Sequence, residues 1–552
     1  IQSVSLAHSA QNNFHSSSPA RSHRGRRRHP PRSSPGLQRL LLLHPSRHLL
    51  LLLPQRSFNP VEMQAGSRRR RKKKRKLEEP PAVSAMGGTH AREPPLGVGD
   101  REEGGAAAAD RISDLPEPIL ADIVSLLPTK EGARTQILAT QWRHLWRSAS
   151  LNLDSNGLAR LGYFFPVDDN ALAAVIPRVL STHPGPVRRF CVPADYLRSR
   201  TAAVEAWLSS RTLDGLCDLE FCDVHSYLKT PLLPLPASAF RFSPTLRVVT
   251  IRKCHLPDST AQAFHFPKLK QLALVAVVVS ETWLNSMIAG CPALECLLID
   301  ATSGIRCVRI NSLSIRSIGV GVGSQRTNQI QELIIENAPS LERLVCLDLF
   351  DCLHVSVTSS PKLQTIGCLS DGYGFSRSHM IGSAEVIQGL HLDRLTAVVC
   401  TVKILAVDLV MLDLDTVIEL MKCFPCLEKL YIESVPEGKN LWRRKHRDLI
   451  KCFDIRLKTI GLGSYQGIKS QVDFLTFFVL NAKMLELMIV RVSYENDSRG
   501  YTAEQYRKLK FENRASRGAR IHFTGHRCLR GASDIDHVRD LDLTDPFFIC
   551  LR

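Results

Sequence analysis

The stretch CPALECLLI at residues 291–299 carries an apolar-x-x-apolar-x-apolar pattern that recurs along most of the chain. Related stretches are FPKLKQLAL at residues 266–274 and FPCLEKLYI at residues 424–432. The clearest copies begin at Leu246, Leu269, Leu294, Leu341, Leu363, Leu427, Leu457 and Leu485, and further candidates at Val187, Leu216, Ile310, Ile330 and Val402. Most successive copies start 20 to 30 residues apart. This period predicts a repeat array in which each unit contributes one short strand and buries its apolar side against its neighbours.

Proline adds a second regularity to the repeats. It stands two residues before the first Leu in six copies, at Pro244, Pro267, Pro292, Pro339, Pro361 and Pro425. Proline has no backbone N–H, and the first residue of a strand tolerates that loss. We therefore expect these prolines to start the strands.

The positions between the apolar residues of each copy point out of the core, because successive side chains of a strand face opposite ways. They predict a concave surface that binds a target protein, or, for each residue alone, ordinary solvated positions. The candidates are Lys270, Gln271, Glu295, Glu342, Arg343, Lys362, Gln364, Glu428, Lys429 and Tyr431. Their mixed charge suits a protein better than a phosphate backbone, which favours a dense basic stripe.

Ahead of the repeats, order begins near Asp110 and apolar residues recur at helical spacing. Asp114 and Glu117 predict a capping box for the first helix, and Thr129 predicts the cap of the second. A third helix carries Trp142, Leu145 and Trp146. So short a unit is too small to bury all this apolar surface by itself. Periodicity leaves two interpretations open, which are a partner-docking module and a helical cap on the next domain.

The stretch from DRISDLPEPIL through QWRHLW, residues 110–146, resembles the F-box of plant F-box proteins. The resemblance implies docking onto the Skp adaptor of an SCF ubiquitin ligase, and through it to cullin and RING subunits. The implied adaptor-binding residues are Leu115, Pro116, Ile119, Leu120, Ile123, Leu126, Leu127, Arg134, Leu138, Trp142, Leu145 and Trp146. One departure predicts a lower adaptor affinity, because Ala139, Thr140 and Gln141 stand where the family has Ser and two basic residues, so two positive charges are lost.

The repeats and the C-terminal part resemble the same family. CPALECL and FPCLEKL resemble its leucine-rich repeats, and residues 453–490, 514–525 and 537–547 resemble its FBD region. Within that region we expect a buried helix followed by a strand from Leu485, and a structural cap at the end of the array. The expected buried residues of the helix are Phe474, Phe477, Phe478, Val479 and Leu480.

The expected fold class is α/β, with a short three-helix F-box, an irregular leucine-rich-repeat solenoid, a C-terminal FBD cap and a disordered basic N-terminus. The expected boundaries are 1–108 for the tail, 109–153 for the F-box, 154–440 for the repeats and 441–552 for the FBD region and cap. The tail is rich in Ser, Pro, Arg, Gly and Ala, a composition that cannot bury a core.

The basic charge of the chain is confined to this tail. Residues 1–76 hold 18 Lys and Arg against the single acid Glu62, which accounts for 17 of the 19 net positive charges. A run of nine basic residues predicts a nuclear-import signal or, alternatively, a solubilising tail. The run consists of Arg68, Arg69, Arg70, Arg71, Lys72, Lys73, Lys74, Arg75 and Lys76. The chain opens with Ile1, so Met63 and Met86 are candidate translation starts, and a start at Met86 would remove the run.

The cysteines and the leucine tracts indicate the cellular compartment of the protein. The 16 Cys lie scattered in apolar stretches, which indicates reduced thiols and a location in the nucleus and cytoplasm. The Leu tracts at residues 40–43 and 49–53 are interrupted by polar residues, and a membrane span needs roughly 20 mostly apolar residues. We therefore expect no transmembrane segment.

No catalytic residue, cofactor or metal is expected. Cys423 and Cys426 lack a second pair of ligands, and His522 and His526 lack the Glu of a zinc hydrolase. The glycines of residues 319–324 lack the strand-to-helix context of a nucleotide loop. Three functions remain, in falling order. They are a non-catalytic substrate receptor of an SCF ligase, a repeat scaffold without ligase coupling, and a nucleic-acid-associated protein using its basic tail.

Overall fold

A computed structural model describes residues 112, 114–155, 169–222, 232–263, 265–322, 330–347, 353–370, 399–409, 412–434, 455–492, 499–525, 529–531 and 534–548. The chain divides into the units 1–103 and 104–552, and all described residues belong to the second unit. The expected tail at residues 1–108, its basic run and the candidate starts Met63 and Met86 lie outside the described residues.

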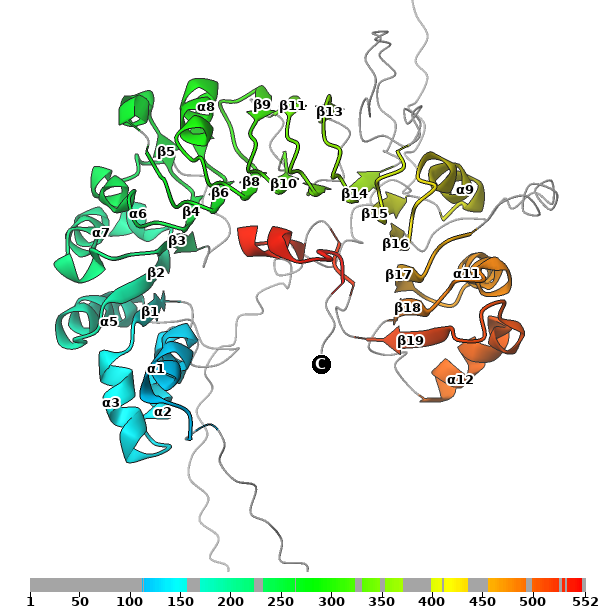
Figure 1. Cartoon of the computed structure of the whole chain (residues 1–552), viewed down its shortest axis with the longest axis horizontal. Coiled ribbons are helices and arrows are strands. Elements are labelled where there is room, and N and C mark those ends of the chain that lie inside the picture. Colours follow the sequence, from blue (N-terminus) through cyan, green and yellow to red (C-terminus); the bar gives the residue numbers. More distant parts are fainter. Residues whose placement is uncertain are drawn as a thin grey trace, which may run out of the picture. The chain divides into compact units, whose positions relative to one another are not determined.

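The described residues form a mixed α/β structure built on one parallel sheet of fourteen strands (Figure 1). Each strand pairs in parallel with the next one in the order below. In spatial order the strands are β1 (Leu151–Asp154), β2 (Val187–Pro193), β3 (Asp218–Cys222), β4 (Val248–Arg252), β6 (Gln271–Val275), β8 (Cys296–Asp300), β10 (Ser317–Val320), β12 (Arg343–Cys346), β14 (Thr365–Ser370), β15 (Ile404–Leu409), β16 (Lys429–Ser434), β17 (Thr459–Tyr465), β18 (Leu487–Val492) and β19 (Arg520–Thr524). This arrangement is consistent with a leucine-rich-repeat solenoid.

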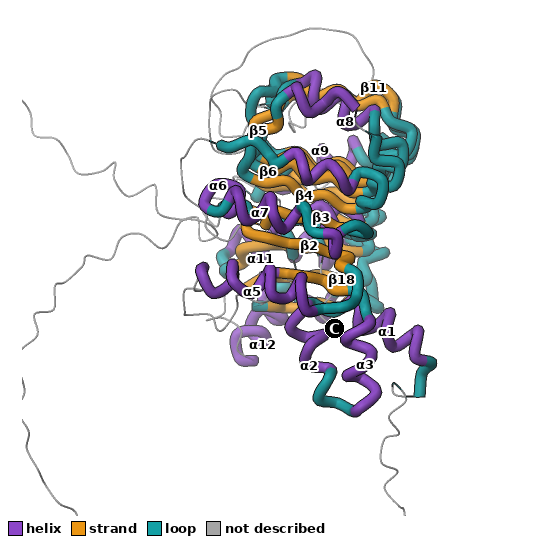
Figure 2. The backbone as a smooth tube through the Cα atoms, turned by 90° about the vertical axis from the view of Figure 1, so that its left-hand side faces the viewer, coloured by secondary structure: helices purple, strands orange, loops and turns teal. Residues whose placement is uncertain are grey.

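Helices line one face of this sheet. In Figure 2, α5, α6 and α7 lie in front of β2 and β3. The helices after the first three are α5 (Asp169–Thr182), α6 (Tyr196–Ser199), α7 (Thr201–Leu208), α8 (Glu281–Ala289), α9 (Leu414–Cys423), α11 (Lys469–Asn481) and α12 (Arg499–Lys508). Short 3-10 helices are η1 (Arg211–Leu213), η2 (Ala237–Phe242), η3 (Asp258–Ala263), η7 (Phe511–Asn513) and η9 (Val538–Asp542). Among the described helices, none combines the length and the apolar character that crossing a membrane requires.

Most predicted repeat copies lead into strands of the large sheet, but two do not. All eight clearest copies do so, as do Val187, Leu216 and Val402. The candidates Ile310 and Ile330 belong instead to a separate three-stranded sheet of β9 (Cys307–Asn311), β11 (Glu332–Asn337) and β13 (His354–Val357). The large sheet is continued there by β10, preceded by the buried Ile315. The prediction was wrong at these two copies because short apolar strands on either side of a repeat share one pattern. A pair of two-residue strands, β5 (His255–Leu256) and β7 (Val278–Val279), forms a third sheet.

The prolines of the repeats lie in turns and do not start the strands. Leu269 N donates to Phe266 O at 3.3 Å, and Leu294 N donates to Cys291 O at 3.1 Å. Pro267 and Pro292 therefore occupy the second position of a four-residue turn, where the fixed φ of proline is favoured. The strand begins four residues after each proline. Proline therefore lies in the turn that joins the preceding segment to the strand.

The FBD region continues the sheet with the same kind of unit. Between β17 and β18, helix α11 buries Phe474, Phe477, Phe478 and Val479, as expected, whereas Leu480 is exposed. Phe478 packs edge-on against Phe474 and Phe477, with ring centroids 5.2 and 5.1 Å apart. The expected C-terminal cap is different in form, because β17, β18 and β19 extend the parallel ladder and the residues that follow turn back along the sheet.

The first three helices are α1 (Glu117–Leu126), α2 (Thr129–Thr135) and α3 (Thr140–Ser148). They lie in the stretch where the periodicity predicts three helices, but α2 ends before Ile137 and Leu138, and the predicted caps are wrong. α1 begins after Pro116 without a side-chain cap, so Asp114 and Glu117 form no capping box. Thr129 is the first residue of α2, and its hydroxyl donates to the Asn152 carbonyl of β1. A contact with the sheet has thus replaced the local cap.

Candidate functional site

Helix α1 has two apolar faces with different environments. Leu120 and Val124 pack in a small core with Trp142, Leu145 and Ala149. Ile119, Ile123 and Leu126 follow one another at helical spacing on another face and are exposed. The helix therefore uses one apolar face for folding and leaves the other in solvent.

The exposed apolar side chains of this unit make up most of the large exposed hydrophobic residues among the described residues. Leu126, Leu138 and Ile137 are 65%, 66% and 83% exposed. The full set is Ile112, Leu115, Ile119, Ile123, Leu126, Ile137 and Leu138, here called the apolar helix surface. So many exposed apolar residues within 27 positions of sequence indicate a docking surface for another protein.

The predicted adaptor-binding residues divide between this surface and the core. Leu115, Ile119, Ile123, Leu126 and Leu138 are exposed, as are Pro116 and Arg134, while Leu127 and Trp146 are half-buried. Leu120, Trp142 and Leu145 lie in the core instead, with Trp142 only 5% exposed. Their assignment to a docking surface is corrected, because these side chains fill the space between α1 and α3. Ile112, which belongs to the stretch that resembles the F-box, is exposed as well, and Ile137 is an exposed apolar residue that was not among the predicted adaptor-binding residues.

The helices are tied to the sheet through its first strand. Asn152 on β1 donates to Ser125 O at 2.5 Å and to Leu127 O at 3.1 Å. His183, just after α5, lies 3.0 Å from Ala149 O, and its ring centroid is 5.2 Å from that of Trp146. The end of α1 and the end of α3 are thus both anchored, which fixes the apolar helix surface relative to the start of the repeats.

A second candidate surface is the face of the sheet opposite the helices, which we call the inner face. It carries Ala273, Leu298, Val345, Ala406 and Ile489, all buried. They are covered by residues 529–531 and 534–548, which we call the C-terminal segment (red in Figure 1). Its buried apolar residues are Leu529, Ile535, Val538, Leu541 and Phe547. The strands that carry these residues are therefore covered on both faces, as parallel sheets commonly are.

Glycines on three strands make room for the C-terminal segment. A Cβ atom at Gly319 would lie 2.9 Å from Leu541 Cδ1, and one at Gly367 would lie 2.5 Å from Phe547 Cζ. A Cβ atom at Gly461 would lie 2.8 Å from Leu529 Cδ2. Each distance is far below a normal carbon–carbon contact of about 3.5–4.0 Å. The missing side chains on β10, β14 and β17 thus create recesses that these three apolar residues fill.

One end of the C-terminal segment is held through Asp545. Its Oδ2 atom lies 2.7 Å from Lys429 Nζ and accepts a hydrogen bond from Tyr431 Oη at 2.7 Å. Burial, and then the charge and hydrogen bond of Asp545, raise the pKa of Tyr431 far above its ordinary value. Tyr431 therefore remains a neutral donor, and its ring lies 6.2 Å from that of Phe547.

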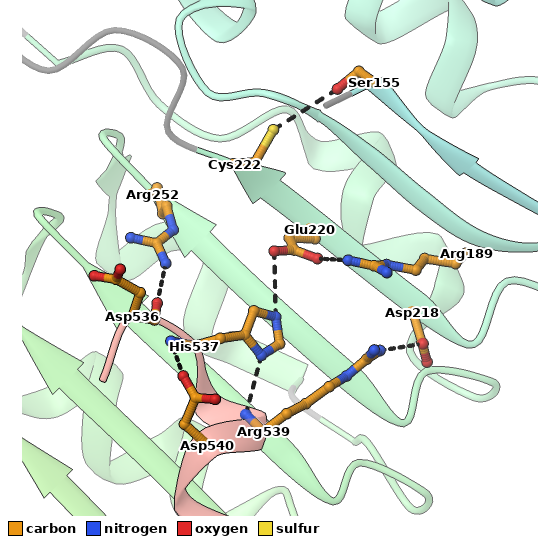
Figure 3. A network of polar contacts seen from close by, with 10 residues as sticks. All are labelled: Ser155, Arg189, Asp218, Glu220, Cys222, Arg252, Asp536, His537, Arg539 and Asp540. Carbon is orange, nitrogen blue, oxygen red and sulfur yellow. Dashed lines mark hydrogen bonds and ion pairs between the residues drawn. The ribbon is translucent and has the colours of Figure 1, made fainter. Parts of the chain in front are cut away.

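The other end is held by charged contacts on β3 and β4 (Figure 3). Arg539 Nη2 lies 2.6 Å from Asp218 Oδ2, and His537 Nε2 lies 3.2 Å from Glu220 Oε1. Arg252 Nη2 donates to Asp536 O at 2.6 Å. These contacts join residues more than 280 positions apart in the sequence.

Glu220 is the most strongly perturbed acid of this cluster. Burial alone would raise its pKa, but the hydrogen bond and charge of His537, together with Arg189 at 2.6 Å, lower that pKa to about 2. The carboxylate therefore remains charged at neutral pH while its side chain is only 11% exposed. A charged acid in this place favours a cation beside it, which Arg189 supplies, and a hydrogen-bond donor above it.

The predicted target-binding residues have three different environments. Tyr431, only 4% exposed, and Lys429 contact the C-terminal segment, and Gln271 Nε2 lies 3.4 Å from Asp542 Oδ2. Arg343 is buried and donates to Ser317 Oγ at 2.8 Å, so its assignment to an open surface is corrected. The remaining candidates lie at the strand beginnings, where Lys270 pairs with Glu295 at 2.6 Å. Glu342 pairs with Arg316, Glu428 pairs with Lys458, and Lys362 and Gln364 are exposed.

The sequence contained one signal for the covered inner face. In β8, Leu297 and Ile299 face the helix-side core, while Cys296 and Leu298 face the C-terminal segment. A strand with apolar residues on both faces indicates burial on both sides. Gly319 in β10 belongs to the same signal, because a Cβ atom there would lie 2.9 Å from both Leu298 Cδ1 and Leu541 Cδ1.

The two residue pairs that were rejected as metal or redox ligands, Cys423 with Cys426 and His522 with His526, lie at ordinary positions of the repeat fold where the structure describes them. Cys423 and Cys426 are half-buried beside the turn that precedes β16, and burial raises the pKa of Cys423. His522 lies on β19, and His526 lies outside the described residues. Over the described ranges, no group of three or more His, Cys, Asp or Glu side chains has a geometry that could hold a metal ion.

Known proteins resemble the chain over much of its length. It is 28% identical to the FBD-associated F-box protein At5g56370 of Arabidopsis thaliana over 73% of this chain and 86% of that protein. It is 23% identical to the Arabidopsis F-box/FBD/LRR-repeat protein At1g13570 over 70% of this chain and 91% of that protein. A third relative, F-box/LRR-repeat protein At4g14103, is 30% identical over 36% of this chain and 51% of its own length.

Two family models match as well. The model of the LRR repeats of FBD-associated F-box protein At5g56370 matches residues 204–432, and the FBD model matches residues 445–490. The chain belongs to the plant F-box/FBD/LRR-repeat family.

The C-terminal segment lies outside the residues that the two family models match. The repeat match ends within β16, and the FBD match includes β17, α11 and the first part of β18. β19 and the C-terminal segment follow the matched FBD residues. The contacts on the inner face are therefore a feature that neither family model describes.

Proposed function

We propose that this family member is a substrate-recognition subunit of an SCF-type ubiquitin ligase. The three N-terminal helices act as the F-box and dock the Skp adaptor through the apolar helix surface. The repeats hold a target protein, and ubiquitin transfer belongs to other subunits. The observation that carries this proposal is the exposed apolar side of α1, on a unit anchored to the first strand of the sheet.

The anchoring matters because a receptor of this kind works by position. An adaptor bound to a flexible module would leave the target at no defined distance from the ubiquitin carrier. Here Asn152 and His183 link the helix ends to β1 and α5. A target held on the repeats would keep a fixed orientation, which raises the effective concentration of its lysines near the carrier.

The test is capture of a recombinant plant Skp adaptor by the full chain. The decisive variant is the double substitution Ile119→Asp and Ile123→Asp, which places two charges on the exposed side of α1. The matched control is Leu313→Asp, since Leu313 is 69% exposed in the repeats and receives the same chemical change. We expect capture by the parent and the control, and loss of at least tenfold in the double variant, because buried apolar anchors dominate such interfaces.

Circular dichroism and thermal melting must show that the double variant is folded. Equal capture by the parent and the folded double variant would remove the apolar helix surface from the mechanism. No capture by a folded parent would refute ligase coupling, with Ala139, Thr140 and Gln141 as the first positions to restore to Ser and basic residues. The alternative function is then a leucine-rich-repeat scaffold that binds protein without a ligase.

We also propose that the basic run at residues 68–76 directs part of the protein to the nucleus. The comparison uses fluorescent fusions that start at Met63 and at Met86, in plant cells. Nuclear enrichment of the longer fusion alone is the expected result. Identical distributions of the two fusions would leave the run as a solubilising segment.

A further inference from the structure

We infer that the C-terminal segment is an internal ligand of the inner face, and that the site it fills also binds a segment of the target protein. The ligand class is a peptide with two apolar residues three positions apart, like Val538 and Leu541, followed by an acid-x-aromatic sequence, like Asp545 to Phe547. This inference rests on the proposed recruitment of a target and assigns the place where the target binds.

The contacts of the segment have the anatomy of a protein–peptide interface. Five apolar side chains are buried in the centre, and three of them enter recesses floored by glycine. Charged contacts stand at both ends, with Asp545 on Lys429 and Arg539 on Asp218. Buried apolar anchors with a polar rim are what specific protein interfaces use.

The segment is attached to the sheet differently from a strand. Several of its backbone hydrogen bonds are internal, such as Arg530 N to Phe547 O at 2.8 Å and Asp540 N to His537 O at 2.9 Å. Its polar contacts with β3, β4 and β16 run through side chains of Asp218, Arg252 and Lys429. The fourteen-stranded ladder pairs without it. Release of the segment therefore leaves the backbone pairing of the sheet complete.

The segment also contacts residues that were expected to bind the target. Lys429, Tyr431 and Gln271 were predicted from their outward positions in the repeats, and all three contact Asp545 or Asp542. A target reaching these side chains must displace the segment. Covalent attachment gives the segment an effective concentration of about millimolar, so a target competes only with high affinity or after the segment is loosened.

The experiment uses the full chain with Leu541→Ala and Phe547→Ala together, which empties two recesses without changing the sheet. The matched control is Leu543→Ala, because Leu543 lies in the same segment and is 40% exposed. Hydrogen exchange measures protection of residues 534–548 against protection of β8, β12 and β16. Trypsin cleavage after Arg539 reports release independently. We expect the double variant alone to lose protection in the segment and to be cleaved there, with protected strands.

The binding probe is a fluorescein-labelled synthetic peptide of residues 529–548, followed by anisotropy. We expect it to bind the double variant at least tenfold more tightly than it binds the parent or the Leu543→Ala control, whose sites are filled. Adding Gly319→Val to the double variant narrows the Leu541 recess and should weaken the peptide again. A peptide carrying Leu541→Ala should then recover affinity for that narrowed site, which separates a closed recess from a misfolded chain.

Three results would overturn the inference. They are loss of protection across β8, β12 and β16 together with the segment, release without peptide binding, and equal peptide binding by parent and double variant. The first would make the segment an integral part of the core. Adaptor capture is measured on the same preparations. Captured adaptor with any of these results refutes the internal ligand alone, and lost capture with tight peptide binding refutes the ligase coupling alone.

Discussion

Substituting Glu220 by Gln removes a buried charge on β3 that contacts Arg189 of β2 and His537 of the C-terminal segment. The native carboxyl has its pKa lowered from 4.5 to about 2. By linkage this lowering corresponds to about 3 kcal/mol of folding free energy at neutral pH. Removing one partner of a buried ion pair generally costs about 3–5 kcal/mol of folding free energy, because the other charge is left buried without compensation. The two magnitudes agree, so we expect Glu220→Gln to destabilise the protein by about 3 kcal/mol at pH 7.

The sign of the pH dependence follows from the lowered pKa. A carboxyl whose pKa is lower in the folded chain stabilises it fully at pH values above 4.5, and this contribution is lost as the pH falls toward about 2. Urea unfolding followed by Trp fluorescence at pH 7, 5, 4 and 3 should show a difference between parent and Glu220→Gln that shrinks below pH 4.5.

Glu336→Gln is the matched control, because Glu336 pairs with Arg309 at an exposed site and should change stability little. A stability difference for Glu220→Gln that stays constant from pH 7 to pH 3 would refute the electrostatic reasoning. The loss of stability in Glu220→Gln would then come from altered packing or hydrogen-bond geometry of the Gln side chain.

Three further predictions use other buried groups. Trp142→Ala should destabilise the N-terminal helices by about 3–5 kcal/mol, measured as a lower melting transition by circular dichroism, because the ring fills their core. Tyr431→Phe removes the hydrogen bond to Asp545 and should cost about 1.5 kcal/mol, seen as faster hydrogen exchange in residues 534–548. Burial raises the pKa of Cys254 to about 12, so maleimide at pH 8 should label the exposed Cys400 and spare Cys254, by peptide mass mapping.

The repeats illustrate how far local pattern reaches. The spacing of Leu269, Leu272 and Leu274 predicts a strand with one buried side, and β6 follows at Gln271–Val275. The same pattern at Ile310 led to the wrong sheet, because apolar alternation describes a strand and not its neighbours. Register in such a fold is set by the preceding unit, which the sequence of one repeat does not contain.

In the N-terminal helices, too, the local pattern predicts the helix but not which of its apolar residues are buried. Ile119 and Leu120 are adjacent apolar residues of α1, and only the position of α3 decides that Leu120 is buried and Ile119 exposed. The predicted caps failed for a related reason. Thr129 has a hydrogen-bond partner on β1, 23 residues away, in place of the local backbone groups of its own helix.

The sequence by itself determined the repeat period, the helical N-terminal unit and the buried helix α11, because each depends on side chains a few residues apart. Only the tertiary structure decided what covers the inner face. Arg539 meets Asp218 across 321 residues, and Gly319, Gly367 and Gly461 lie close both to side chains of neighbouring strands and to Leu541, Phe547 and Leu529. Contacts so distant leave no periodic trace in the chain, since they depend on the sheet having already brought its strands together.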